Sequence, residues 1–254
     1  MNGKKIELRI ADGIARITLV DPENHNTVSL GFTQELSQAA FLCESDPSVK
    51  VVLLASAGKV FSFGGDINEF VANRDRIQTH VRQMTVHFHS ALLTLNRMRA
   101  PVVAAVKGMA AGGGFSLVCM SDMAIAARSA KFNFAYTRSG LTPDGGSTYF
   151  LPRLVGPQKA FDIMATNPTL SAIEAEALGI VARVVEDDCF DQEVEALVAT
   201  LVALPSESLP RLKGLLKQSL TASLEQQFES EAQSISEIAA TPATLAGFET
   251  FLAR

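Results

Sequence analysis

The chain has 254 residues, of which 47% are hydrophobic and 19% charged, which is typical of a protein with a folded core and not of a disordered chain. That length allows one large domain, or one domain with a helical appendage. The formal net charge is -5 and no block of Lys and Arg occurs, which argues against a nucleic acid partner.

The cysteines and the apolar runs bear on where the protein works. Cys43, Cys119 and Cys189 are far apart and form no CxxC pair, which indicates reducing, cytoplasmic surroundings. The N-terminal residues carry scattered charges and lack the apolar region of a signal peptide. The longest uncharged apolar stretch, Gly108–Met120, is shorter than the ~20 residues that span a bilayer. We therefore expect a cytoplasmic protein without a membrane segment.

Short β-rich runs open the chain. Ile6–Ile10 and Ile14–Leu19 flank Ala11-Asp12-Gly13 and predict a hairpin. Residues 30–44 have the apolar spacing of a helix. Val51–Ala55 is a continuous apolar run, which predicts a buried strand.

The middle of the chain alternates helical and strand patterns. Residues 73–99 predict one long helix that ends before Pro101. Val102–Val106 predicts a second buried strand, and Met123–Ala127 predicts a third after a short helix. The last strand signal is Val181–Val185.

This alternation predicts an α/β fold, in an order that differs from the regular βαβ pattern of a Rossmann domain. Residues 190–254 are rich in Ala, Leu, Glu and Gln and read as mostly helical. We therefore expect a core over residues 1–190 and a helical C-terminal region over residues 191–254.

Two glycine clusters stand between a predicted buried strand and a predicted helix. One lies in Phe61–Ile67 (FSFGGDI) and the other in Ala110–Ser116 (AAGGGFS). Glycine lets a ligand approach the backbone, and a helix N-terminus presents free N–H groups. Two such turns side by side could each donate one N–H to the same oxyanion. Ordinary tight turns are the alternative. Neither cluster reads as GxxxxGK[ST] or as a complete dinucleotide fingerprint, which argues against a nucleotide triphosphate or NAD site.

Four segments resemble a known family. Residues 61–70 (FSFGGDINEF) resemble F-x-x-G-x-D-[IL]-x-E, which lines the CoA site of crotonase enzymes. Residues 101–127 resemble the family's P-x-x-A-x-x-x-G-x-x-x-G-G-G segment, and residues 140–156 resemble its G-[LI]-x-P-x-x-G-[GS]-[TS] segment. Pro22–Val28 resembles an early P-x-x-x-N-[AST] turn. The matches run in family order over roughly residues 5–190, so the chain is identified as a member of the crotonase (enoyl-CoA hydratase/isomerase) superfamily.

The resemblance implies a fold and a site. The fold would be a crotonase-like spiral of ββα units with a helical C-terminal region, assembled as a homotrimer or a dimer of trimers. The substrate would be an acyl-CoA thioester, with coenzyme A present only as part of the substrate and with no other cofactor and no metal. The backbone N–H groups of Gly65 and Gly113 would form the oxyanion hole. The other residues expected around the substrate are Phe63, Gly64, Asp66, Ile67, Gly112 and Tyr136.

The sequence departs from the hydratase pattern at two positions. Hydratases of this family hold water with two glutamates, and the matching positions here are Ser116 and Tyr136. Serine has no useful basicity near pH 7, and tyrosine has a reference pKa of ~10. Hydration by two carboxylates is therefore disfavoured, although hydratase-like activity stays an alternative.

One acid remains in a position that the resemblance makes catalytic. Asp144 lies where several family members that convert 3-enoyl-CoA to 2-enoyl-CoA carry their acting carboxylate. That reaction needs one base, which takes a proton from C2 and returns it to C4, and it passes through a dienolate that an oxyanion hole would stabilise. The alternative is that Asp144-Gly145 is simply a common turn pair. We favour the isomerase.

Two further alternatives stay open. Family members that dehalogenate aryl-CoA thioesters use an aspartate at this position as a nucleophile, and His89 and Tyr136 match their histidine and aromatic residue by spacing. His89 could equally be a solvated helix residue. The second alternative is a CoA-ester-binding protein without catalytic activity. A serine hydrolase is disfavoured because Ser116 lacks the second glycine of GxSxG, and no HExxH pair suggests a metal.

Apolar and basic residues complete the candidate site. Lys59 stands beside the first glycine turn and could approach the CoA phosphates, although a surface lysine is the simpler explanation. Several apolar residues could wall an acyl pocket or could be ordinary core: Phe61, Phe63, Ile67, Phe70, Phe132, Phe134 and Leu141.

Overall fold

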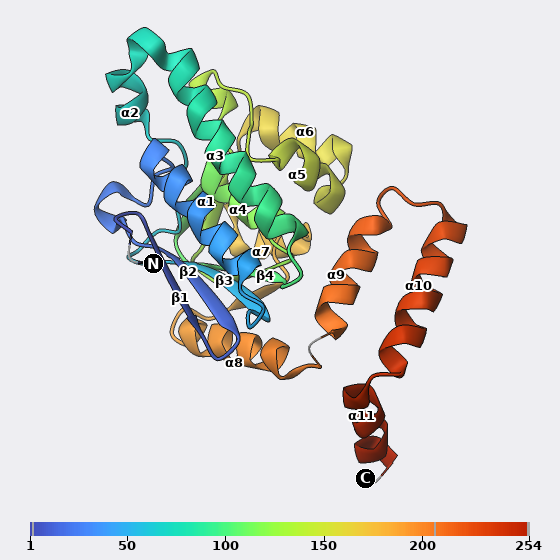
Figure 1. Cartoon of the computed structure of the whole chain (residues 1–254). Coiled ribbons are helices and arrows are strands. Elements are labelled where there is room, and N and C mark those ends of the chain that lie inside the picture. The colour runs from blue at the N-terminus through green and yellow to red at the C-terminus, as the bar shows by residue number, and fades with distance from the viewer. Residues whose placement is uncertain (2, 206, 253–254) are drawn as a thin grey trace.

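The computed structural model describes residues 1, 3–205 and 207–252. Its strands form two sheets (Figure 1). The larger has the order β1-β2-β3-β4-β6-β9, with β1 Ile6–Ala11, β2 Ile14–Leu19, β3 Val51–Ser56, β4 Val102–Val106, β6 Met123–Ala127 and β9 Arg183–Val185. The smaller has the order β5-β7-β8, with β5 Met109–Ala111, β7 Lys131–Asn133 and β8 Leu170–Ser171.

The predicted N-terminal hairpin is confirmed. β1 and β2 pair antiparallel from Ile6 opposite Leu19 to Ala11 opposite Ile14. Asp12 and Gly13 make the two-residue turn with φ values of 54° and 80°, which is the left-handed backbone that such hairpins require. From β2 to β9 every neighbouring pair is parallel, so the carboxyl ends of these strands meet at one edge of the sheet.

Helices cover both faces of the large sheet. The bounds are α1 Leu30–Ser45, α2 Ile67–Ala72, α3 Ile77–Arg97, α4 Gly113–Met120, α5 Ser147–Val155, α6 Pro157–Thr166, α7 Ala172–Ala177, α8 Phe190–Ala203, α9 Ser208–Gln218, α10 Leu224–Ala239 and α11 Pro242–Leu252. The helices α1 and α3 lie side by side on one face (Figure 1). Phe190, Val194 and Leu197 of α8 pack on the other face.

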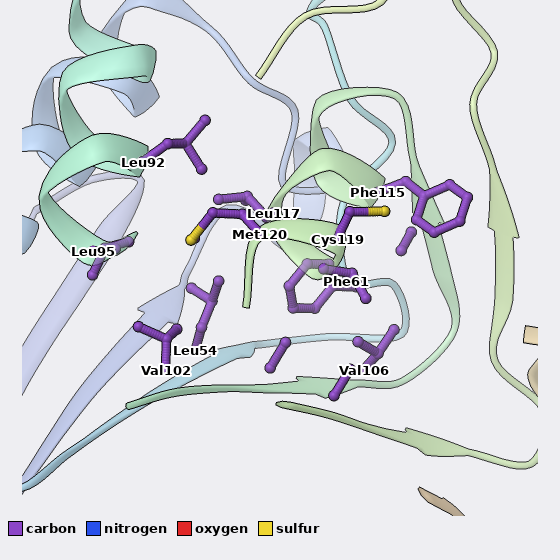
Figure 2. Close-up of a cluster of buried hydrophobic side chains, with 14 of the residues drawn as sticks. Leu54, Phe61, Leu92, Leu95, Val102, Val106, Phe115, Leu117, Cys119 and Met120 are labelled. Atoms are coloured by element: carbon purple, nitrogen blue, oxygen red, sulfur yellow. The ribbon is translucent and has the colours of Figure 1, made fainter. Parts of the chain in front are cut away.

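The core explains why the central strands are apolar throughout. Val52 and Leu54 of β3 point into the larger core, whereas Val51 and Leu53 point toward α8. Figure 2 shows part of the larger core, where Leu54 and Val102 of the sheet lie among side chains of α3 and α4. A strand buried on both faces needs no polar alternation, which is why these strands were predicted as continuous apolar runs.

The predicted single helix over residues 73–99 is wrong at its beginning. Asn73 is the C-cap of α2, because its backbone (φ -108°, ψ 18°) leaves the helical range. A 3-10 turn follows at Arg74–Arg76, and Arg76 has a non-helical backbone (φ -134°, ψ 28°), so α3 begins only at Ile77. The three-stranded sheet was not predicted, because its strands have only two or three residues each.

The last three helices extend away from the core (Figure 1). The α9 helix is attached through Lys213, whose Nζ donates to the carbonyls of Leu95 and Ala100 and lies 2.7 Å from Asp122 Oδ2. Many large apolar side chains of these helices are exposed, among them Leu212, Leu216, Leu224, Phe228 and Ile235. The division of the chain at residue 190 stays a prediction.

No helix in the described ranges is both long enough and apolar enough to cross a bilayer.

Candidate functional site

The two glycine turns predicted from the sequence lie against each other. Ser62 and Ala110 form a parallel bridge, and the Ala111 N–H donates to the Ser62 carbonyl at 2.8 Å. A side chain on Gly64 would place its Cβ 2.7 Å from the Ala111 oxygen and 3.1 Å from the Gly113 nitrogen. The turns can approach this closely because Gly64 has none.

Each turn contributes a glycine to the wall of the same cavity, Gly65 from the first and Gly113 from the second. The Val28 N–H donates to the Gly64 carbonyl and the Asp66 N–H donates to the Val28 carbonyl, so the peptides on both sides of Gly65 are fixed. Gly113 is the first residue of α4, where N–H groups have no acceptor within the helix. Within the described ranges neither the Gly65 nor the Gly113 N–H has a hydrogen-bond acceptor in the protein. They can therefore serve as a pair of oxyanion donors.

Replacing Gly64 with Ala is expected to disrupt this pair. Gly64 has a φ of +81°, which strains any other residue, and the new Cβ would push the Ala111 carbonyl and the Gly113 nitrogen away. Since the loss of one oxyanion donor typically costs ~10²–10³ in rate, we expect kcat to fall by about 10² or more. Initial rates with the acyl-CoA substrate would test this, with Gly156→Ala as the control because it adds strain at the same φ of +81° in open space and outside the cavity wall. Equal kcat values for the two variants would contradict the expectation.

The cavity measures about 570 Å³. Gly65, Gly112 and Gly113 line it together with Tyr136 and Asp144, so the glycines and the proposed acid face one space. Its remaining wall is largely apolar: Val28, Phe63, Ile67, Phe70, Val71, Ile77, Val81, Met84, Phe88, Phe134 and Leu141.

Not every apolar candidate belongs to this wall. Phe61 and Phe132 are fully buried core residues outside the cavity, so the hypothesis that they wall it is wrong. Phe61 is in the core cluster of Figure 2. Their segments matched strand and turn patterns correctly, but such patterns do not distinguish a core face from a cavity face.

A hydrogen-bonded group replaces the two glutamates of the hydratase pattern. The Tyr136 hydroxyl donates to Asp144 Oδ1 at 2.5 Å and lies 3.3 Å from Ser116 Oγ. The hydroxyls of Ser116 and Ser147 lie 3.1 and 2.8 Å from the Asp144 carbonyl, to which they can donate, and so fix the backbone of the acid. Burial, and then the negative charge of Asp144, raise the pKa of Tyr136 well above its ordinary value. The phenol therefore keeps its proton and remains a donor.

His89 lies beside this group but outside the cavity. Its Nε2 accepts the Gly145 N–H at 3.3 Å, and its side chain is exposed. It contacts the residue that follows Asp144 and does not line the cavity. The position of His89 therefore suits a role in holding the Asp144 loop.

Four other candidates also lie outside the cavity wall: Gly64, Asp66, Ser116 and Lys59. Asp66 caps α2 by accepting the Glu69 N–H at 3.1 Å, which is a structural role. Lys59 is exposed, and its backbone carbonyl lies where a Cβ on Gly108 would clash.

Sequence reasoning missed the wall that α3 provides. Ile77, Val81, Met84 and Phe88 recur at the spacing of one helix face and line the cavity. That periodicity was visible in the sequence, but an apolar helix face most often packs against the core. Arg74, just before α3, also lines the cavity and was not singled out.

Comparison with known proteins places this geometry in a family. The family model for enoyl-CoA hydratase/isomerase matches residues 9–254. The chain is 32% identical over 231 residues to 4-chlorobenzoyl coenzyme A dehalogenase-2 of an Arthrobacter species, covering 91% of this chain and 84% of that one. It is 30% identical over 223 residues to 1,2-epoxyphenylacetyl-CoA isomerase of Escherichia coli, covering 87% and 85%.

A solved structure agrees with the fold over nearly the whole chain. The crystal structure of an enoyl-CoA hydratase from Mycobacterium smegmatis superposes with a TM-score of 0.90 at 30% identity, covering 98% of this chain and 96% of that one. With the family model spanning most of the sequence, this confirms the crotonase-like fold that the motifs implied. The chain belongs to the enoyl-CoA hydratase/isomerase family of acyl-CoA enzymes.

Proposed function

We propose that the protein is an isomerase that moves the double bond of a 3-enoyl-CoA to give a 2-enoyl-CoA, with Asp144 as the proton carrier. The observation that supports this most directly is the composition of the cavity. Among the described residues, Asp144 is the one carboxylate in its wall, and it shares that wall with the Gly65 and Gly113 turns. One base and one oxyanion hole are what the 1,3-proton shift needs.

The reaction balances without any co-reactant. The Asp144 carboxylate takes a proton from C2, and the C2–H electron pair becomes the C1–C2 double bond of a dienolate. The negative charge collects on the thioester oxygen, where the Gly65 and Gly113 N–H groups donate to it. The Asp144 carboxyl then returns the proton to C4, the double bond settles between C2 and C3, and the thioester carbonyl re-forms.

Tyr136 would position the acid for both proton transfers. Because its hydroxyl occupies Oδ1, the Oδ2 atom of Asp144 is the oxygen available to the substrate. A single oxygen could serve C2 and C4 in turn when it lies over one face of the planar dienolate, within reach of both carbons.

Replacing Tyr136 with Phe should lower kcat by about tenfold to a hundredfold with little change in KM. The variant loses the hydrogen bond that orients the carboxylate but keeps the aromatic wall, and a charge-assisted hydrogen bond contributes about 1.5–3 kcal/mol. Initial rates with a 3-enoyl-CoA would measure the effect. Tyr149→Phe is the matched control, because Tyr149 is the other tyrosine of the chain and lies outside the cavity wall. An unchanged kcat in Tyr136→Phe would contradict the proposal that Tyr136 positions Asp144.

A second candidate is nucleophilic dehalogenation of an aryl-CoA. The Asp144 carboxylate in the cavity wall and the similarity to 4-chlorobenzoyl coenzyme A dehalogenase-2 favour it. An Asp144 oxygen would add to the ring carbon that bears the halogen, halide would leave, and water would hydrolyse the resulting aryl ester. We rank it second because His89 Nε2 already accepts the Gly145 N–H and the side chain is outside the cavity wall.

A panel of three esters would test the proposal: a 3-enoyl-CoA, a 2-enoyl-CoA and 4-chlorobenzoyl-CoA. We expect conversion of the 3-enoyl ester alone. Hydration of the 2-enoyl ester would mean that another group replaces the two glutamates. Halide release would favour the second candidate, and binding of all three without turnover would indicate a CoA-ester-binding protein.

We also propose that the chain forms a homotrimer or a dimer of trimers. The exposed apolar side chains of α9 and α10 support this, because such faces are usually covered in an assembly.

A further inference from the structure

The cavity extends along α3, well beyond the hydrogen-bonded group of Ser116, Tyr136 and Asp144. Phe88 marks its catalytic end, since a Cβ on Gly113 or on Gly145 would lie 3.7 or 2.7 Å from the Phe88 ring. Ile77, eleven residues earlier in the same helix, also lines the cavity. At about 1.5 Å per residue, the wall between them runs for about 16 Å.

Arg74 lies beyond Ile77, at the end of the wall remote from Phe88. Of the described residues it is the one basic side chain in the cavity wall. Its nearest acid is its neighbour Asp75 at 3.8 Å, and the two side chains are 81% and 98% exposed, so this pair holds the guanidinium weakly. Arg76, by contrast, donates from Nε and Nη2 to Asn73 Oδ1 at 3.2 and 3.1 Å.

The wall between these two ends is mostly apolar, and the hydroxyl of its polar α3 residue, Thr85, donates to the Arg82 carbonyl. Between Phe88 and Arg74 the cavity contacts side chains such as Val81, Ile77 and Val71. A hydrocarbon chain has no polar group to leave unpaired against an apolar wall. The two amides of a pantetheine arm, in contrast, would need hydrogen-bond partners there. This segment of the cavity therefore suits the acyl group better than the CoA arm.

We propose that Arg74 binds a carboxylate at the far end of the acyl group, so that the preferred substrates are CoA esters of long dicarboxylic acids. The inference rests on the proposed function only in placing the thioester at the glycine pair. A guanidinium can donate two parallel hydrogen bonds to a carboxylate. An acyl chain that ends in a methyl group offers no acceptor for these bonds.

Binding of saturated, unreactive esters tests this without any turnover. The probes are pairs of acyl-CoA esters of equal length, one ending in a methyl group and one in a carboxylate, with about eight to sixteen acyl carbons to cover the ~16 Å wall. Calorimetry would give Kd values for the wild type, for Arg74→Met and for Arg76→Met. Arg76→Met is the control. It removes the same charge from a side chain two residues away, and that side chain does not line the cavity.

Arg74→Met should weaken binding of the carboxylate-ended esters about fivefold to tenfold, at the lengths that reach Arg74, and should change the methyl-ended esters by less than about twofold. Arg76→Met should change neither. Equal weakening of both members of a pair would overturn the inference and place Arg74 on a CoA phosphate. No weakening in either would overturn it as well. Since none of these outcomes depends on catalysis, failure of the isomerase proposal would be seen separately, in the three-ester panel.

Discussion

Replacing Asp144 with Asn should lower kcat for a 3-enoyl-CoA by about 10³ or more while leaving the Kd for the ester nearly unchanged. The amide cannot take a proton from C2, and general acid–base catalysis typically contributes ~10²–10⁴. The amide oxygen can still accept the Tyr136 hydroxyl, and the backbone bonds from Ser116 and Ser147 do not involve the side chain. The cavity should therefore keep its shape.

Two controls make this result specific. Asp162→Asn removes the same charge from α6, where Asp162 pairs with Lys159 at the surface, and should leave the rate unchanged. Calorimetry with a saturated acyl-CoA would verify that Asp144→Asn still binds its ligand. If the variant retained most of its activity, Asp144 would not be the proton carrier.

The second large effect concerns stability. Lys213→Met should lower the free energy of unfolding by about 3 kcal/mol, because it removes the cation that Asp122 and two backbone carbonyls share. Lys217 on the same helix lies 3.4 Å from Asp122 and is more exposed, so Lys217→Met should cost about 1 kcal/mol or less. Urea unfolding at one protein concentration would compare them. If both variants lost a similar amount of unfolding free energy, burial of Lys213 would not make its ion pair more stabilising than that of Lys217.

The same lysine predicts a dependence on pH. Burial lowers the pKa of Lys213 to about 8, from an ordinary value near 10.4. Between these values the unfolded chain binds one more proton at this site than the folded chain, so the contribution of Lys213 to the free energy of unfolding increases as pH rises from about 8 to about 10. The difference between wild type and Lys213→Met should follow this trend.

Much of the fold could be predicted because its elements have clear periods. The hairpin and the strands β3, β4 and β6 are regular runs that the structure reproduces within a residue or two. The break between α2 and α3 could not be predicted, because it depends on the non-helical backbones of Asn73 and Arg76. The short strands β5, β7 and β8 exist only through pairing between segments distant in sequence.

The site could be predicted where the motif fixed its residues. Gly65, Gly113, Tyr136 and Asp144 do line one cavity, as the resemblance implied. The cavity face of α3 could not be recognised, because an apolar stripe looks the same whether it meets the core or a ligand. The bond from Tyr136 to Asp144 was also not predicted, because it depends on how the loop around Gly140 folds back.

The two glycine turns meet through main-chain atoms, whereas Tyr136 and Asp144 meet through their side chains. In the proposed reaction, activation of the thioester would depend on main-chain N–H groups, which are present in every sequence that keeps the turns. In the same proposal the choice of reaction would depend on the side chains at positions 116, 136 and 144, which hydrogen-bond among themselves, with Ser116 also reaching the Gly112 carbonyl of the second turn. On this proposal, a change of reaction would need new side chains at these three positions, while the two glycine turns could stay as they are.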